Sequence, residues 1–177
     1  MPHFNFDSYN HVIVEMPVLT QQDKDGNEHF FSYFEANRNN GLVKIGFFGE
    51  VNCWEHEQHY SNEQLAALSF VEDHQTEILA ALFDYTKNIL YPTHLEYIGY
   101  DEVSFPEINS VDDLRKALGV KLISFFYEHK EGVSYCGLDC SFSGDYEHGV
   151  QIVMHKTNIL GWQENLGKEL VFADLNI

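Results

Sequence analysis

The segment Ser143–Gly149 (Ser-Gly-Asp-Tyr-Glu-His-Gly) is the strongest local cluster of chemically reactive side chains in this chain, because they lie between two segments with a clear strand pattern. Asp145, Glu147 and His148 lie between two segments that alternate like strands, so we expect them on a turn. Two carboxylates and an imidazole can bind a divalent metal ion or act as an acid–base pair. The same side chains also suit a solvent-facing turn or a contact with a protein partner. We predict partner contact for them and for Tyr146, and keep the metal or catalytic role as the alternative.

A second group of candidate ligands lies in the segment Cys53–His59. On a helix, His56 and His59 would share a face and chelate zinc. The segment precedes a predicted helix start, however, so we expect a loop, and the H-E-x-x-H pattern of metalloproteases is absent. Glu55 and Glu57 are therefore predicted to contact a partner, and no metal is predicted.

Other signatures of catalysis are weak in this sequence. The segment Asp23–Glu28 opens like a calcium loop, but Phe34 stands where an EF-hand needs a bidentate glutamate, so a hairpin turn is predicted. The sequence has no G-x-S-x-G motif and no glycine-rich phosphate loop. We predict no catalytic residue and no cofactor, and favour a binding protein over an enzyme.

Negative charge is the dominant feature of the composition. The chain carries 28 acidic and 10 basic side chains, a net charge of −18. The excess is spread evenly: residues 1–60 hold nine acids and three bases, 61–120 eleven and three, 121–177 eight and four. The folded surface itself must then be negative, which disfavours nucleic acids and anionic membranes and favours basic proteins.

The length of 177 residues and the 44% hydrophobic content indicate one folded domain, residues 1–177. No apolar run reaches the roughly 18 residues of a membrane span, and the first residues lack the features of a secretory signal. Cys53, Cys136 and Cys140 are odd in number. The last two are expected on one strand, on the same face but too far apart to bond. Reduced thiols predict a cytoplasmic location.

The first fifty residues read as three strands, His11–Leu19, Glu28–Ala36 and Leu42–Gly49, joined by turns rich in Asn, Asp and Gly. An antiparallel meander is predicted. Ser61 and Gln64 then form a capping box that begins a helical region. Apolar residues recur there at helical spacing, with a polar interval at 72–76 that predicts two helices.

Pro92 is predicted to end the second helix, and Leu95–Tyr100 to form a short strand or an extended loop. Ser110 is predicted to cap a helix over Val111–Leu118 that Gly119 ends. Period-two alternation follows and predicts the strands Lys121–Glu128, Ser134–Phe142, Val150–His155 and Asn158–Trp162. The fold class is therefore α+β, an antiparallel sheet from N- and C-terminal strands with a helix pair on one face and one further short helix.

Aromatic residues make up 15% of the chain. Most phenylalanines are expected in the core. Tyr135, Tyr146 and Trp162 lie near predicted strand ends or turns, and we predict that they anchor a partner, as tyrosine and tryptophan do in many interfaces.

Several segments together resemble an uncharacterised bacterial domain family associated with polymorphic-toxin immunity proteins. They are Tyr60–Gln64, Ile78–Tyr91, Pro106–Leu114 and Glu147–Gly149 with its flanking strands, about two-thirds of the chain. Family members carry a Trp-Asp-x-Glu-His-Gly signature at the turn. Asp145, Glu147, His148 and Gly149 match that signature, but Gly144 replaces its tryptophan. The resemblance implies an immunity function and carries no established activity.

Two functions from different classes follow from these observations. The first is an immunity-type protein that neutralises a toxin with a basic cleft by direct binding; its oligomeric state is left open. The alternative is a metal-dependent enzyme or metal-binding protein that uses Asp145, Glu147 and His148. A third reading is a module that self-associates through an exposed strand edge.

Overall fold

The computed structural model describes residues 11–20, 41–48, 60–98, 107–143, 145–163 and 168–176, and gives the backbone alone for 95–98, 145–148 and 163. The elements in chain order are β1 (Val12–Glu15), β2 (Leu42–Phe47), α1 (Asn62–Asp73), α2 (Gln75–Tyr85), a π-helical segment (Thr86–Leu90), α3 (Tyr91–Ile98), α4 (Val111–Ala117), β3 (Leu118–Lys130), β4 (Val133–Phe142), β5 (Asp145–His155), β6 (Asn158–Gln163) and α5 (Glu169–Leu175). Within those ranges no helix is long and apolar enough to cross a membrane.

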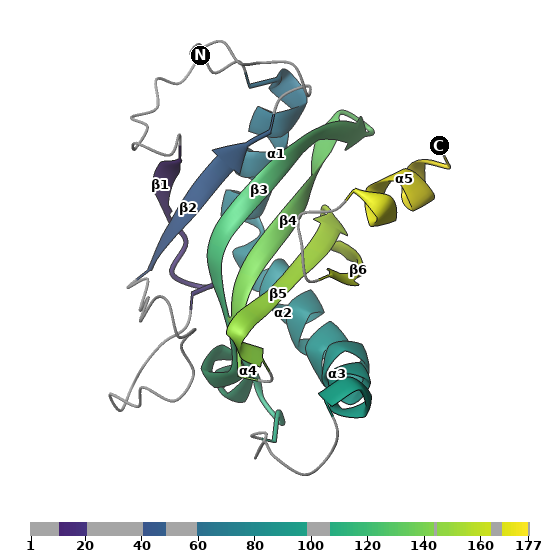
Figure 1. Ribbon diagram of the computed structural model, residues 1–177. Helices are drawn as coiled ribbons and strands as arrows, with labels where there is room; N and C mark the ends of the chain where they lie inside the picture. Colours follow the sequence, from purple (N-terminus) through teal and green to yellow (C-terminus); the bar gives the residue numbers. More distant parts are fainter. Residues whose placement is uncertain are drawn as a thin grey trace.

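The six strands form one sheet whose spatial order follows the chain order (Figure 1). Neighbours pair antiparallel, except that β2 and β3 are parallel. A parallel pair needs a crossover connection, which α1 to α4 supply. The α+β prediction is confirmed. The predicted N-terminal meander is wrong in its order, because β1 pairs directly with β2; the predicted strand Glu28–Ala36 lies outside the described residues.

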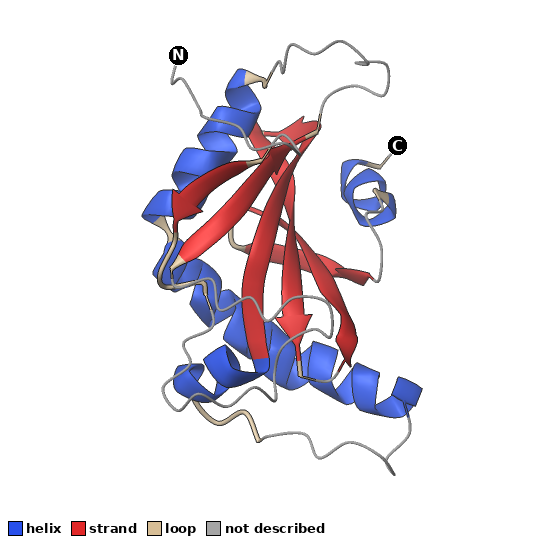
Figure 2. Ribbon diagram, turned by 60° about the vertical axis from the view of Figure 1, so that its left-hand side comes forward, coloured by secondary structure: helices blue, strands red, loops and turns tan. Residues whose placement is uncertain are grey.

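The sheet has two differently covered faces, which strand alternation produces. The face against α1 and α2, here the helix face, holds the main core, with Ile45, Phe125 and Leu138 fully buried. The opposite face, here the α5 face, holds a second core of Phe126, Tyr135 and Val153 with Val171 of α5. Figure 2 shows α1 and α2 on one side of the strands and α5 on the other.

The predicted capping box at the start of α1 is confirmed, and it also ties the helix to the sheet. The Gln64 amide donates to Ser61 Oγ at 3.1 Å, and the Ser61 amide donates to Gln64 Oε1 at 2.9 Å. Gln64 is fully buried, and its Nε2 donates to the carbonyls of Phe48 and Phe125 at 2.8 and 3.0 Å. One side chain thus joins the start of α1 to the end of β2 and to the middle of β3.

The helix break predicted at 72–76 is confirmed at His74, which leaves the helical region of φ and ψ. The prediction that Pro92 ends the second helix is wrong, as is the strand or loop predicted from Leu95, because the chain stays helical to Ile98. The π-helical segment explains this: the amide of Tyr91 donates to Thr86, five residues back. Pro92 then falls in the first turn of α3, where a missing N–H is tolerated.

Ser110 caps α4 as predicted, accepting a hydrogen bond from the Asp113 amide at 3.2 Å. Gly119 does not end the helix, which is a correction. The helix stops at Ala117, and Leu118 is already extended and pairs with Phe142. Because Leu118 already pairs with β4, the chain passes directly from α4 into β3. Gly119 is therefore not needed as a left-handed helix cap. Helix α5 was not predicted.

Candidate partner-binding site

The backbone that carries the sequence's main candidate residues is strand, and the predicted turn over Ser143–Gly149 is wrong in its extent. Asp145 pairs with Phe142, so only Ser143 and Gly144 separate the two strands. The strand β5 therefore begins three residues after β4 ends, and the residues from Asp145 onward are strand instead of turn. Asp145, Tyr146, Glu147 and His148 belong to the first half of β5, and their side chains lie outside the described part.

This half of β5 bulges out of the ladder. Phe142 and Cys140 of β4 are two residues apart, whereas their partners Asp145 and Val150 are five apart. Gly149 has a φ of +74°, and a Cβ there would collide with the carbonyl oxygen of Cys140. The glycine of the motif is thus a structural requirement of the bulge. Bulges are common beside functional sites because they redirect side chains.

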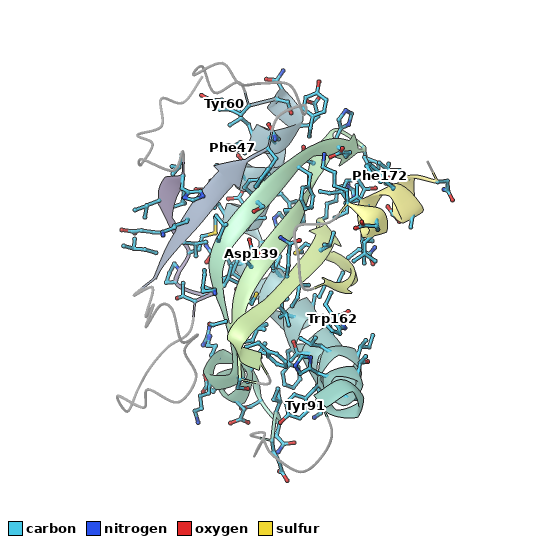
Figure 3. The ribbon with its side chains drawn as sticks, viewed as in Figure 1. Phe47, Tyr60, Tyr91, Asp139, Trp162 and Phe172 are labelled. Atoms are coloured by element: carbon cyan, nitrogen blue, oxygen red, sulfur yellow. The ribbon has the colours of Figure 1, made fainter. Side chains whose placement is uncertain are left out.

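A partly buried carboxylate lies next to the bulge, on the α5 face near the middle of the sheet (Figure 3). Gln151 Nε2 donates to Asp139 Oδ1 at 2.9 Å across the β4–β5 pair, and Ser124 Oγ lies 3.5 Å from Oδ2. Gly137 makes room for this contact, since a Cβ there would come within 2.9 Å of the Gln151 side chain. The site is therefore built by three adjacent strands.

Burial raises the pKa of Asp139, and this outweighs the Gln151 hydrogen bond, the Lys121 charge and the Ser124 hydroxyl, which all lower it. A carboxyl of this kind takes up a proton more readily than a surface aspartate and can exchange protons or meet a cation. Asp139 is not among the site residues that the sequence predicts. The signal was present: in Leu138–Phe142, Asp139 interrupts an otherwise apolar and small-residue strand.

Replacing the carboxyl by an amide tests this environment. Asp139→Asn is expected to be more stable than the wild type at pH 7, because the folded state then no longer buries a charge. A raised folded-state pKa means that the wild type regains stability as pH falls through that value toward the ordinary aspartate pKa of about 3.9. The gap between the two proteins in urea denaturation should therefore close toward low pH. A gap that widens there would contradict the assignment.

Trp162 lies on the other face of the sheet. It pairs with Ile152 and packs, half-buried, against the helix-face core. Its ring meets His94 edge-on at 5.7 Å between ring centroids, and His94 in turn meets Phe142 at 5.2 Å. The structure thus separates Trp162 from Asp139 by the thickness of the sheet. Glu55 and Glu57 lie outside the described residues, and the third predicted anchor, Tyr135, is fully buried under α5.

A run of exposed acids follows the outer side of α1 and α2. Glu72, Asp73, Glu77 and Asp84 are all exposed, while the sheet-facing positions of both helices are buried. We call these four the acidic ridge. Residues 60–98 contain six carboxylates and a single lysine, Lys87. The pKa of Glu72 is raised, first because part of its carboxyl is shielded from water and second because the Asp73 charge lies close by.

The two described cysteines are structural. Cys136 and Cys140 are buried free thiols in the helix-face core, as predicted for one face of one strand. Burial raises the pKa of Cys136 to about 12, and burial with the nearby Asp139 charge raises that of Cys140. Neither is a thiolate at neutral pH. Among the described residues no three His, Cys, Asp or Glu side chains gather as metal ligands. The metal alternative rests on Asp145, Glu147 and His148, whose side chains are not among those described.

Comparison with known proteins gives one family match. Residues 26–165 match a model described as "Domain of unknown function (DUF6985)". The match includes α1 through β6 and ends before α5. No curated protein and no solved structure matches the chain significantly. Because the family model covers more than three-quarters of the 177 residues, this chain belongs to the DUF6985 family.

Proposed function

We propose that this DUF6985 protein is an immunity-type binding protein that neutralises a bacterial toxin by direct protein–protein contact in the cytoplasm. The acidic ridge is the observation that carries the proposal. Four exposed carboxylates on two adjoining helices, within a chain of net charge −18, suit a partner with a basic cleft. A basic cleft is common in proteins that act on nucleic acids, and an acidic surface can occupy it in place of phosphates.

In binding of this kind, charge governs the association rate and apolar contact governs the dissociation rate. The ridge and the overall charge accelerate encounter with a cationic partner. Desolvated aromatic anchors then slow dissociation. Asp145, Tyr146, Glu147, His148, Glu55, Glu57 and Trp162 remain the proposed contact residues, and Glu72 and Glu77 join them from the ridge.

A metal-dependent role is the second candidate. It is favoured by one observation: the bulge that carries Glu147 and His148 lies beside Asp139, whose pKa is raised. This function requires metal in stoichiometric amount after purification without chelator. It also requires a lower melting temperature after addition of EDTA. Protein that is metal-free and insensitive to EDTA would eliminate this candidate.

Toxin neutralisation is tested by growth rescue. The tagged chain is purified from its native cell, and a co-purifying protein is identified and expressed alone in a heterologous host. That protein is expected to be basic and to arrest growth, and co-expression of this chain is expected to restore growth. Growth arrest that the chain fails to relieve, or a partner without toxicity, would contradict the proposal.

A further inference from the structure

Helix α5 covers a separate apolar surface on the sheet, on the side away from the acidic ridge (Figure 1). Val171 is fully buried against Phe126, Tyr135 and Val153, which are themselves buried. Gly161 of β6 permits this approach, since a Cβ there would come within 3.0 Å of the Leu170 side chain. This cluster is distinct from the main core on the helix face. Removing α5 would expose the cluster and leave the main core intact.

Polar contacts hold both ends of α5. Lys168 Nζ pairs with Glu128 Oε1 at 2.7 Å before the first turn. In the last turn, Asp174 Oδ2 accepts from the Tyr135 hydroxyl at 2.6 Å and from Lys130 Nζ at 2.9 Å. The Tyr135 hydrogen bond and the Lys130 ammonium lower the pKa of Asp174, so it stays ionised.

These charges oppose the intrinsic preference of the helix. A helix favours acids at its start and bases at its end. Glu169 in the first turn of α5 follows this preference, but the two charges that contact the sheet, Lys168 at the N-cap and Asp174 in the final turn, oppose it. Seven residues are also too few for a stable isolated helix. The helix therefore depends on its docking surface for stability. That surface has an acid (Glu128) where α5 begins and a base and a tyrosine (Lys130 and Tyr135) where it ends, with apolar side chains between them.

We infer that this surface, formed by Phe126, Glu128, Lys130, Tyr135 and Val153, is a binding site for an amphipathic helix of the protein partner, and that α5 occupies it in the isolated chain. The inference rests on the proposed function and names the chemistry of the partner segment. Charge complementarity defines the occupant: a lysine or arginine at the start, apolar residues two and three positions later, and a carboxylate six positions after the base. The partner helix displaces α5.

A labelled peptide of residues 168–176 tests the site without any toxin. The full chain carries either Asp174→Lys, which places a second cation beside Lys130, or Glu169→Lys. The latter makes the same change of net charge at an exposed position of the same helix. Because self-occupation reduces the apparent affinity, the peptide is expected to bind Asp174→Lys at least about tenfold more tightly than Glu169→Lys.

A second peptide, with its aspartate replaced by lysine, is expected to bind Asp174→Lys about tenfold more weakly than the native peptide, since Lys130 then repels it. Fluorescence anisotropy reads both, and circular dichroism verifies that both variants fold. Equal affinity of the two variants for the native peptide, or of one variant for the two peptides, would overturn the inference, as would no binding at all.

The partner obtained from the growth-rescue experiment provides the final arm. Asp174→Lys is expected to bind that partner more tightly than Glu169→Lys, because its site is already vacated. If neutralisation holds but the two variants bind the partner equally, the helix site is refuted and the proposed function stands. If the peptides behave as expected but the partner is not a toxin, the function is refuted instead.

Discussion

Gly149→Ala is expected to lower the free energy of unfolding by about 3 kcal/mol or more, within the exceptional range for single substitutions. Two effects add together. An alanine at a φ of +74° adopts a left-handed conformation that costs about 1–2 kcal/mol. Its Cβ would also strike the carbonyl oxygen of Cys140 across the β4–β5 pair, so the bulge must move. Urea denaturation measures the loss.

Gly132 offers a matched control for this prediction. Its φ is +73°, almost the same as that of Gly149, but a Cβ there meets nothing within 4 Å. Gly132→Ala is therefore expected to cost about 1–2 kcal/mol, the backbone term alone. Equal losses for the two variants would show that the contact with Cys140 contributes nothing and that the bulge tolerates a side chain.

Reversing charges on the acidic ridge is expected to slow association with the basic partner at low salt by about tenfold or more. The double variant Glu72→Lys/Glu77→Lys places two cations where the ridge meets the approaching cleft. Both side chains are exposed, so stability should change little. Stopped-flow fluorescence at low ionic strength measures the association rate constant, which should change more than the dissociation rate constant.

The control for the ridge is a double variant of equal charge. Glu15→Lys/Glu169→Lys changes the net charge by the same amount at two exposed positions away from α1 and α2. It is expected to slow association several-fold less than the ridge variant. If both variants lower the association rate constant equally, net charge alone steers the encounter, and the position of the acidic ridge does not matter.

The parts of the fold that the sequence predicts best are those that local chemistry determines. Ser61 with Gln64, and Ser110 with Asp113, cap their helices as their spacing predicts. The β3–β4 turn follows the same rule: Glu131 and Gly132, in the predicted turn, both have positive φ. In each case the residues that interact lie within four positions of one another, so the sequence alone brings them together.

Long-range pairing accounts for the errors. Asp145 is turn-like by composition, but its pairing with Phe142 makes it strand. Pro92 ends most helices, yet the π-helical segment before it changes the hydrogen-bond register and lets α3 continue. Helix α5 has no side-chain N-cap, and its end charges Lys168 and Asp174 oppose its dipole, so local sequence does not predict it. Only Glu128, Lys130 and Tyr135, some forty residues earlier in the chain, account for those charges.

The candidate site was predictable in part. The motif at Asp145–Gly149 indicated the right region of the sheet, and the structure adds that its glycine serves a bulge. The alternation along its strand is enough to predict that Asp139 lies on the other face of the sheet from the apolar residues Leu138 and Cys140. The placement of Trp162 on the helix face depends instead on its pairing with Ile152, which no local pattern reveals.

The most direct test of the central claim, that this protein acts through electrostatically steered binding of a basic protein, is the association rate constant measured across ionic strength. The Debye length falls from about 30 Å at 0.01 M salt to about 10 Å at 0.1 M and 3 Å at 1 M. The association rate constant for the purified partner is predicted to fall at least about tenfold over that range, while the dissociation rate constant changes little. An association rate constant that does not depend on salt would contradict the claim.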